Sequence, residues 1–251
     1  MRKAFDQGRI FGTTYGSAPF RVLALPGWMH TTSDFDACLG ALAPSTGCVA
    51  LDLPGFGGAT PEPARAMGSA GYAAAVAPVL HHDLEAPAVV VGHSFGGRVA
   101  LHLAVAHPEQ VAALVLTGVP LLRRTDRPAA KPPLAFRVAR ALHRRGLLSD
   151  ERMEARRRRS GSADYRNAPS TIMRDVLVTA TNETYEEQLA ALRCPVELVW
   201  GEADDQAPAS VAERTASILG SQATLTTLSG VGHLTPTSAP EAIVSAVRRH
   251  L

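Results

Sequence analysis

The stretch that decides the fold is residues 88–97, with the sequence AVVVGHSFGG. Its four apolar residues predict a buried strand, and the apolar segment after Ser94 predicts a helix over 95–107. Between them, G-H-S-F-G fits the G-x-S-x-G pattern of a strand–turn–helix elbow, where small neighbours leave room for a sharp turn at the serine. The turn lifts the Ser94 hydroxyl clear of the sheet as a nucleophile and directs the Phe95 N–H toward a developing oxyanion.

Apolar runs on both sides of this elbow alternate with helix-like segments. The runs lie at 20–25, 48–53, 111–117, 196–200 and 223–228, and 2–5 could pair with 9–15 as an edge hairpin. The helix-like segments lie at 33–42, 69–84, 95–107, 211–219 and 240–251. Continuous apolar strands that alternate with helices predict an α/β fold with a mostly parallel sheet and helices on both faces.

One segment interrupts this alternation. Residues 121–185 contain no convincing strand, include Pro128, Pro132 and Pro133, and are otherwise compatible with helices and rich in arginine. The simplest interpretation is an inserted helical cap, or lid. We therefore predict an α/β core formed by residues 1–120 and 186–251, with the cap over 121–185.

A serine hydroxyl needs a base, and His233 is the best placed of the nine histidines. It lies in a Gly-rich loop between the last strand and the last helix, which opens onto the carboxyl edge of the sheet beside Ser94. The remaining histidines fit surface or supporting positions. We expect His93 to support the elbow, whereas His30, in a loop that borders the pocket, has no partner following it at a useful position.

The acid that orients this base is expected in the loop 201–208, which follows a strand and offers the carboxylates of Glu202, Asp204 and Asp205. The chain order Ser94, Asp204, His233 matches the order Ser…Asp…His that accompanies this type of elbow. An acidic loop can also be a solvated turn or a helix N-cap, and Asp205 suits either of those.

The second oxyanion donor is expected from the loop after an early strand. Residues 25–30 (LPGWMH) occupy that position, so the Trp28 N–H would join that of Phe95. The Trp28 indole and Met29 would form a wall of the acyl pocket. Further candidates for the substrate pocket are Pro120, Leu234 and, from the cap, Tyr165, Met173 and Leu177.

These residues resemble the α/β-hydrolase superfamily, especially its small, capped, carboxylesterase-like branch, over nearly the whole chain. The loop 52–57 (DLPGFG) is similar to the family's D-x-P-G-x-G loop, and the family's G-x-x-D loop before a proline aligns its acid with Asp204. The resemblance implies a central eight-stranded sheet with a cap inserted after the strand 111–117. Most relatives carry His-Gly at the oxyanion loop, where this chain has Pro26 and Gly27, so the histidine that usually braces the loop is missing.

Composition limits the compartment and the cofactors. The 251 residues carry a net charge of +2, which is too small to indicate a nucleic-acid partner. Three widely spaced cysteines indicate neither a disulfide framework nor a zinc site, no run approaches the roughly 20 apolar residues of a transmembrane helix, and the N-terminus lacks a secretory signal. We expect a cytoplasmic protein that uses no metal and no organic cofactor.

Charge is divided unevenly between the cap and the rest of the chain. Residues 121–185 contain 15 Lys and Arg against 7 Asp and Glu, a net of +8, which leaves −6 elsewhere. The densest run is RRRR at 156–159. This pattern is typical of a solvated arginine-rich surface, or it steers an anionic acyl carrier such as coenzyme A or an acyl carrier protein.

The expected function is that of a serine hydrolase that cleaves a carboxylic ester or thioester through an acyl-enzyme. The same three residues would also serve C–C bond hydrolysis, perhydrolysis or cyclisation in a biosynthetic pathway, because substrate choice depends on the pocket and the cap. A third alternative is a non-catalytic ligand-binding protein on a hydrolase scaffold. That alternative predicts the loss of Ser94, Asp204 or His233, and none of them is missing.

Overall fold

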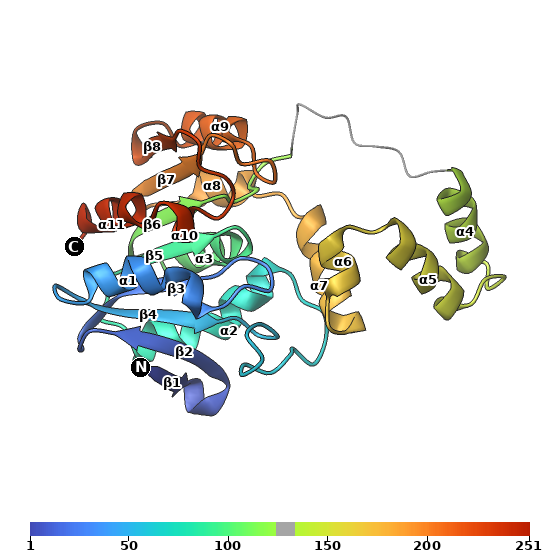
Figure 1. Ribbon diagram of the computed structural model, residues 1–251, viewed down its shortest axis with the longest axis horizontal. Helices are drawn as coiled ribbons and strands as arrows, with labels where there is room; N and C mark the ends of the chain where they lie inside the picture. The colour runs from blue at the N-terminus through green and yellow to red at the C-terminus, as the bar shows by residue number, and fades with distance from the viewer. Residues whose placement is uncertain (124–133) are drawn as a thin grey trace.

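The computed structural model describes residues 1–123 and 134–251, apart from the side chain of Ser160. An eight-stranded sheet in the order β1-β2-β4-β3-β5-β6-β7-β8 runs through its centre (Figure 1). The strands are β1 (Arg2–Phe5), β2 (Ile10–Tyr15), β3 (Phe20–Leu25), β4 (Gly47–Asp52), β5 (Ala88–His93), β6 (Val111–Thr117), β7 (Val196–Gly201) and β8 (Ala223–Leu228). β1 and β2 form the expected antiparallel edge and the other six strands run parallel, which confirms the predicted fold class.

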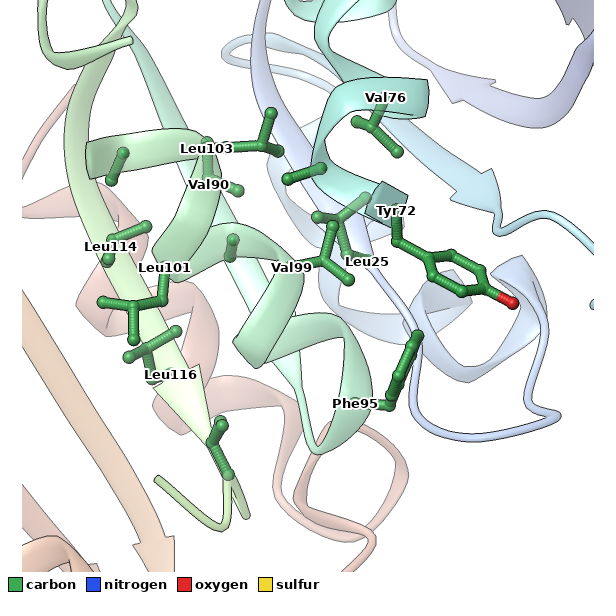
Figure 2. Close-up of a cluster of buried hydrophobic side chains, with 14 of the residues drawn as sticks. Leu25, Tyr72, Val76, Val90, Phe95, Val99, Leu101, Leu103, Leu114 and Leu116 are labelled. Carbon is green, nitrogen blue, oxygen red and sulfur yellow. The ribbon is translucent and has the colours of Figure 1, made fainter. Parts of the chain in front are cut away.

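Helices cover both faces of the sheet. One face carries α1 (Asp36–Leu42) and α11 (Pro240–Arg248), and the other carries α2 (Ser69–His82), α3 (Phe95–Ala106) and α9 (Ala209–Leu219). Successive side chains of β5 enter opposite cores: Val89 and Val91 pack on the side of α1, and Val90 packs under α3 (Figure 2). Because both faces are buried, the strands are continuous apolar runs rather than alternating ones.

Short elements complete the core. They are the 3₁₀ turns η1 (Asp6–Gly8), η2 (Thr32–Phe35), η3 (Pro108–Gln110) and η4 (Gly220–Gln222), together with the helices α8 (Glu186–Ala191) and α10 (Thr235–Ser238). In the described part of the chain, no helix is both long enough and apolar enough to cross a membrane.

The described residues between β6 and α8 form helices and no strand. These are α4 (Leu134–Arg144), α5 (Asp150–Ser160), α6 (Ala163–Asn167) and α7 (Thr171–Asn182). α4 and α5 lie away from the sheet, whereas α7 leads back to it, and its residues Met173, Val176 and Ala180 belong to the buried cluster on the α2–α3 face (Figure 1). Pro128, Pro132 and Pro133 lie outside the described residues, and the division into a core and a cap at 121–185 stays a prediction.

A buried arginine fixes the points where the chain leaves and re-enters the sheet. Arg98 of α3 is 8% exposed, and its guanidinium donates to the carbonyl of Ala180 at 2.5 Å and to that of Pro120 at 3.5 Å. Its Cζ lies 5.7 Å from the centre of the Tyr185 ring. Since Pro120 follows β6 and Ala180 lies in the last turn of α7, the helix that begins at the elbow contacts both ends of the helical segment.

A carboxylate near Arg98 holds the start of α2. Glu183 accepts hydrogen bonds from the Ser69 N–H at 3.0 Å, the Ser69 hydroxyl at 2.8 Å and the Tyr185 hydroxyl at 2.6 Å. A Cβ on Gly68 would overlap the Glu183 carboxylate, so a larger residue there would displace this side chain from the start of α2. α2 therefore begins on a negative charge supplied from more than 100 positions further along the chain.

Candidate active site

Ser94 occupies a strained turn between β5 and α3. Its φ of 48° and ψ of −112° lie in a region that residues with side chains rarely adopt. The Ser94 N–H donates to the Thr117 carbonyl at 3.0 Å, and its carbonyl accepts from the Gly97 N–H at 3.1 Å. A Cβ on Gly92 would overlap the backbone of Gly97, so the turn closes only with glycine at both places. The half-buried serine side chain is thus presented at the carboxyl edge of the sheet.

The candidate base and acid are in direct contact. His233 Nδ1 lies 2.8 Å from Oδ2 of Asp204, whose side chain is 1% exposed. The other Asp204 oxygen, Oδ1, accepts the N–H groups of Gln206 at 2.9 Å and Ala207 at 2.8 Å. The fixed carboxylate requires a proton on His233 Nδ1, which leaves Nε2 as an acceptor. By contrast, Glu202 and Asp205 are both exposed.

The end of β6 joins this pair to the elbow. Thr117 holds the Ser94 N–H, and the next residue, Gly118, has a φ of +58°. A Cβ on Gly118 would lie 3.0 Å from Nδ1 and Cε1 of His233 and 3.2 Å from Oδ2 of Asp204. The structure therefore brings the three predicted residues to one edge, from three different loops.

His93 links the elbow to the candidate base. Its Nε2–H donates to the His233 carbonyl at 3.0 Å, and the two rings are 4.9 Å apart. Burial, followed by repulsion from His233, lowers the pKa of His93 to about 4. His93 is consequently a neutral donor at ordinary pH, and it holds the backbone of the loop that carries His233.

The predicted oxyanion loop lies directly against the elbow. A Cβ on Gly96 would overlap the Leu25 and Pro26 carbonyls, and a Cβ on Gly27 would lie 2.8 Å from His93 Nδ1 and 3.4 Å from Ser94 Cβ. Glycine at both positions lets the two backbones meet. The Trp28 N–H makes no hydrogen bond with any residue that the structure describes. The two predicted donors, Trp28 and Phe95, therefore lie on adjoining segments.

Aromatic rings that the sequence did not reveal support these segments. Trp28 packs edge-on against Phe56 at 5.4 Å and against Phe95 at 5.7 Å. Tyr72 packs edge-on against Phe95 at 4.9 Å (Figure 2 labels these two residues). The Tyr72 hydroxyl donates to the Pro54 carbonyl at 3.0 Å. Phe56 and Pro54 belong to the loop 52–57, so that motif was the available signal for this support.

The prediction that His30 has no useful partner is wrong. Its Nδ1 lies 2.6 Å from Oδ2 of Asp34, four residues further on. The contact with Asp34 raises the pKa of His30 above its usual value, more than burial lowers it. A second imidazole–carboxylate pair therefore borders the oxyanion loop.

The predicted pocket residues fall into two groups. Met29 and Pro120 are half-buried, and Leu234 is 42% exposed; they flank Trp28, Gly118 and His233 in sequence. Tyr165 and Leu177 instead line a cavity of about 500 Å³ whose described lining lies entirely within 136–181. Met173 is fully buried and contacts the Tyr72 hydroxyl through its sulfur at 3.9 Å, so it packs α7 onto the core.

The fold agrees with that of known proteins. A model of the alpha/beta hydrolase family matches residues 22–246, and the chain belongs to this family. It is 30% identical over 210 residues to the pimeloyl-[acyl-carrier protein] methyl ester esterase of Aromatoleum aromaticum, covering 75% of this chain and 81% of that protein. Over 42 residues, 17% of this chain and 16% of the relative, it is 64% identical to lipase LipV of Mycobacterium tuberculosis.

Among solved structures, a putative lipase from Acinetobacter baumannii AYE superimposes with a TM-score of 0.74 at 19% identity. The alignment covers 99% of this chain and 90% of that structure. At this identity the likeness concerns the fold, and it confirms the α/β-hydrolase architecture that the elbow motif predicted.

Proposed function

We propose that this α/β-hydrolase enzyme is a serine hydrolase that cleaves a carboxylic ester or thioester, with Ser94, His233 and Asp204 as its catalytic triad. The observation that carries the proposal is the 2.8 Å contact between His233 Nδ1 and Asp204, packed against Gly118 beside the strained Ser94 turn. A nucleophile, a base and an acid meet there in the roles that acyl transfer requires.

The reaction has two stages. His233 Nε2 accepts the Ser94 proton while Ser94 Oγ attacks the carbonyl carbon, and the N–H groups of Phe95 and Trp28 bind the oxyanion. Collapse of the tetrahedral intermediate breaks the C–O or C–S bond, and His233 returns the proton to the leaving alkoxide or thiolate. Water then attacks the acyl-enzyme by the same proton path, which releases the acid and restores Ser94.

We place the substrate along the predicted pocket residues. Met29, Pro120 and Leu234 border the reacting carbonyl, and the cavity that contains Tyr165 and Leu177 receives the distal part of a longer substrate. Two arginines, Arg140 and Arg157, line this cavity. The apolar part of its lining includes Phe136, Met153 and Val178. Met173 contributes indirectly, because it seats α7 against the core.

The basic helical segment supports a substrate that is attached to an anionic carrier. The name of the Aromatoleum aromaticum relative gives the methyl ester of an acyl group on an acyl carrier protein as its substrate. In the run 156–159, Arg157 and Arg158 lie 3.9 and 3.3 Å from Glu154, so part of that charge is offset within α5. Arg144 and Arg145 lie on the exposed surface and make no ion pair with the described residues, and we infer that they attract phosphate or carboxylate groups.

Replacing the nucleophile tests the proposal. Ser94→Ala should lower kcat for p-nitrophenyl butyrate by at least about 10³-fold, because no other group takes over the attack. By mass spectrometry, a fluorophosphonate should form one covalent adduct on the wild type, at Ser94, and none on the variant. Ser217→Ala is the matched control, because the Ser217 hydroxyl is exposed and donates only to the Glu213 carbonyl of its own helix at 3.0 Å. Persistent turnover by Ser94→Ala would refute the assignment.

The acid is tested by a pair of adjacent substitutions. Asp204→Asn should lower kcat by on the order of 10³–10⁴-fold, because an amide cannot hold His233 in the same tautomer and stabilise its charge. Asp205→Asn should stay within a few-fold of the wild type, since that side chain is exposed. The opposite ranking would move the acid by one residue.

A further inference from the structure

The turn that presents the Trp28 N–H is held in a strained conformation. The His30 N–H closes it on the Gly27 carbonyl at 3.1 Å, which places Trp28 and Met29 at its centre. Met29 has a φ of +57°, a left-handed conformation that costs a residue with a side chain roughly 1–2 kcal/mol. Pro26 comes directly before Gly27, and its side chain has no hydrogen-bonding group that could brace the turn. Other contacts must keep this conformation.

The contacts on either side of the turn 27–30 do not involve the side chain of its last residue, His30. On one side, the Trp28 indole lies edge-on to Phe56 and Phe95. On the other, the buried carboxylate of Asp52 accepts the Thr32 N–H at 3.0 Å. Neither of these two contacts involves the peptide between Met29 and His30, which is held inside the turn by the hydrogen bond from the His30 N–H to the Gly27 carbonyl.

His30 is fixed by its own side chain. Nδ1 lies 2.6 Å from Oδ2 of Asp34, and Asp34 is part of η2, whose N-terminus is capped by the Thr31 hydroxyl. The other side of the ring packs edge-on against His93 at 5.9 Å. His30 therefore lies next to His93, which in turn donates to the His233 carbonyl.

We propose that the His30–Asp34 pair is the positioning device of the oxyanion loop, and that it holds the Trp28 N–H in line with the oxyanion. The proposal rests on the function proposed above. Neither residue is a catalytic residue: they act through the backbone of Trp28. Their loss should therefore affect the transition state, in which the oxyanion is charged, more than the bound ester, whose carbonyl is neutral.

The test separates kcat from KM. Removing one oxyanion donor typically lowers kcat by about 10²–10³-fold. A displaced donor should cost less, so His30→Ala and Asp34→Ala should each lower kcat for p-nitrophenyl butyrate on the order of 10–100-fold, with KM within about threefold. The double variant should be no worse than either single one, because the two side chains act as one unit.

Two further measurements exclude a general structural defect. The Ki of a trifluoromethyl ketone, which forms a tetrahedral oxyanion adduct on the serine, should rise by the factor by which kcat falls. His30→Asn keeps an N–H near the position of Nδ1 and should restore kcat to within about threefold of the wild type. The matched control is Lys3→Ala, which breaks the Lys3–Asp83 pair, a pair of similar exposure far from the site. It should leave kcat, KM and the ketone Ki unchanged.

The outcomes are distinguishable. Wild-type kcat in folded His30→Ala and Asp34→Ala, judged by circular dichroism and Tm, would overturn the positioning role, and so would a loss of kcat without a parallel rise in the ketone Ki. If His30→Ala does not fold, Asp34→Asn and His30→Asn decide by the same two constants. An active Ser94→Ala enzyme would instead overturn the proposed function, whatever the His30 variants do.

Discussion

The protonation state of His93 follows from its place beneath the elbow. Its ring is fully buried, and its Nε2–H donates to the carbonyl of His233. Because the pKa falls from 6.5 to about 4 on folding, the unfolded chain binds a proton at this residue between those pH values and the folded chain does not. The stability of the folded state that depends on neutral His93 is therefore fully present above pH 6.5, and it is lost as the pH falls toward 4.

This linkage predicts a pH-dependent stability difference. Between pH 7 and pH 4.5 the wild type should lose about 2 kcal/mol of unfolding free energy through His93. His93→Gln, which keeps a donor near Nε2 but does not titrate, should lack that component. Urea unfolding followed by circular dichroism at both pH values measures the difference. Equal losses in the two proteins would show that His93 is protonated without cost.

The residues that sequence identified are those whose chain neighbours reveal their role. Ser94 is bracketed by glycines, Asp204 and His233 each follow a strand in the order this elbow requires, and the structure brings all three together. Asp34, Phe56 and Tyr72 act only through contacts with other segments, and nothing next to them in the chain marks that role. For Asp34 the spacing of four residues from His30 was a visible signal, but a 3₁₀ turn rather than a helix creates the contact.

At the scale of elements, α2 depends on a charge from the residue that follows α7. Glu183→Ala should lower the unfolding free energy by about 1–2 kcal/mol, because it removes a carboxylate that accepts the first N–H of the helix and two hydroxyls. Glu213→Ala, at an exposed position in the middle of α9, is the control and should change stability by less than about 0.5 kcal/mol. Chemical denaturation with matched m values checks both, and equal effects would contradict the capping role.

Strands were predicted more closely than helix starts. Each predicted strand run is within two residues of the observed one, because runs buried on both faces stand out from their surroundings. The predicted helix over 33–42 instead begins as the 3₁₀ turn η2 and becomes α-helical only at Asp36. The cause is tertiary: the Thr32 N–H is taken by the Asp52 carboxylate, which sets the direction in which the chain enters α1.

At the scale of the whole molecule, the segment 121–185, which contains α4 and α5, carries a net positive charge, whereas the rest of the chain is net negative. If these helices attract an anionic carrier, replacing Arg144 and Arg145 with Ala should raise KM for an acyl-CoA several-fold and leave p-nitrophenyl butyrate unaffected. The effect should shrink with added salt, because exposed charges are screened over about 10 Å at 0.1 M. Arg65→Ala with Arg193→Ala, two exposed arginines outside this segment, is the control. Equal KM changes for both substrates would exclude steering.

The sequence predicted the α/β architecture but not how the helical segment meets it. Apolar periodicity identifies buried strands and helices from residues that are close in sequence. The contacts of Arg98 with Ala180 and of Met173 with Gly55 instead join residues about 80 to 120 positions apart. Tyr165 and Leu177 illustrate the difference. Their composition suggested a pocket, and the structure places them in a cavity lined by the helical segment itself.

The two carbonyls that Arg98 binds suggest how this enzyme can be rebuilt. Pro120 and Ala180, near the two ends of the helical segment, accept hydrogen bonds from the same side chain of α3, so a residue of the core helps to set their separation. A replacement segment that keeps Pro120 and Ala180 would keep both hydrogen bonds to Arg98. Grafting helical segments from other hydrolases between Pro120 and Ala180 is therefore a rational route to new substrate preferences, because the graft leaves the elbow and the junctions intact.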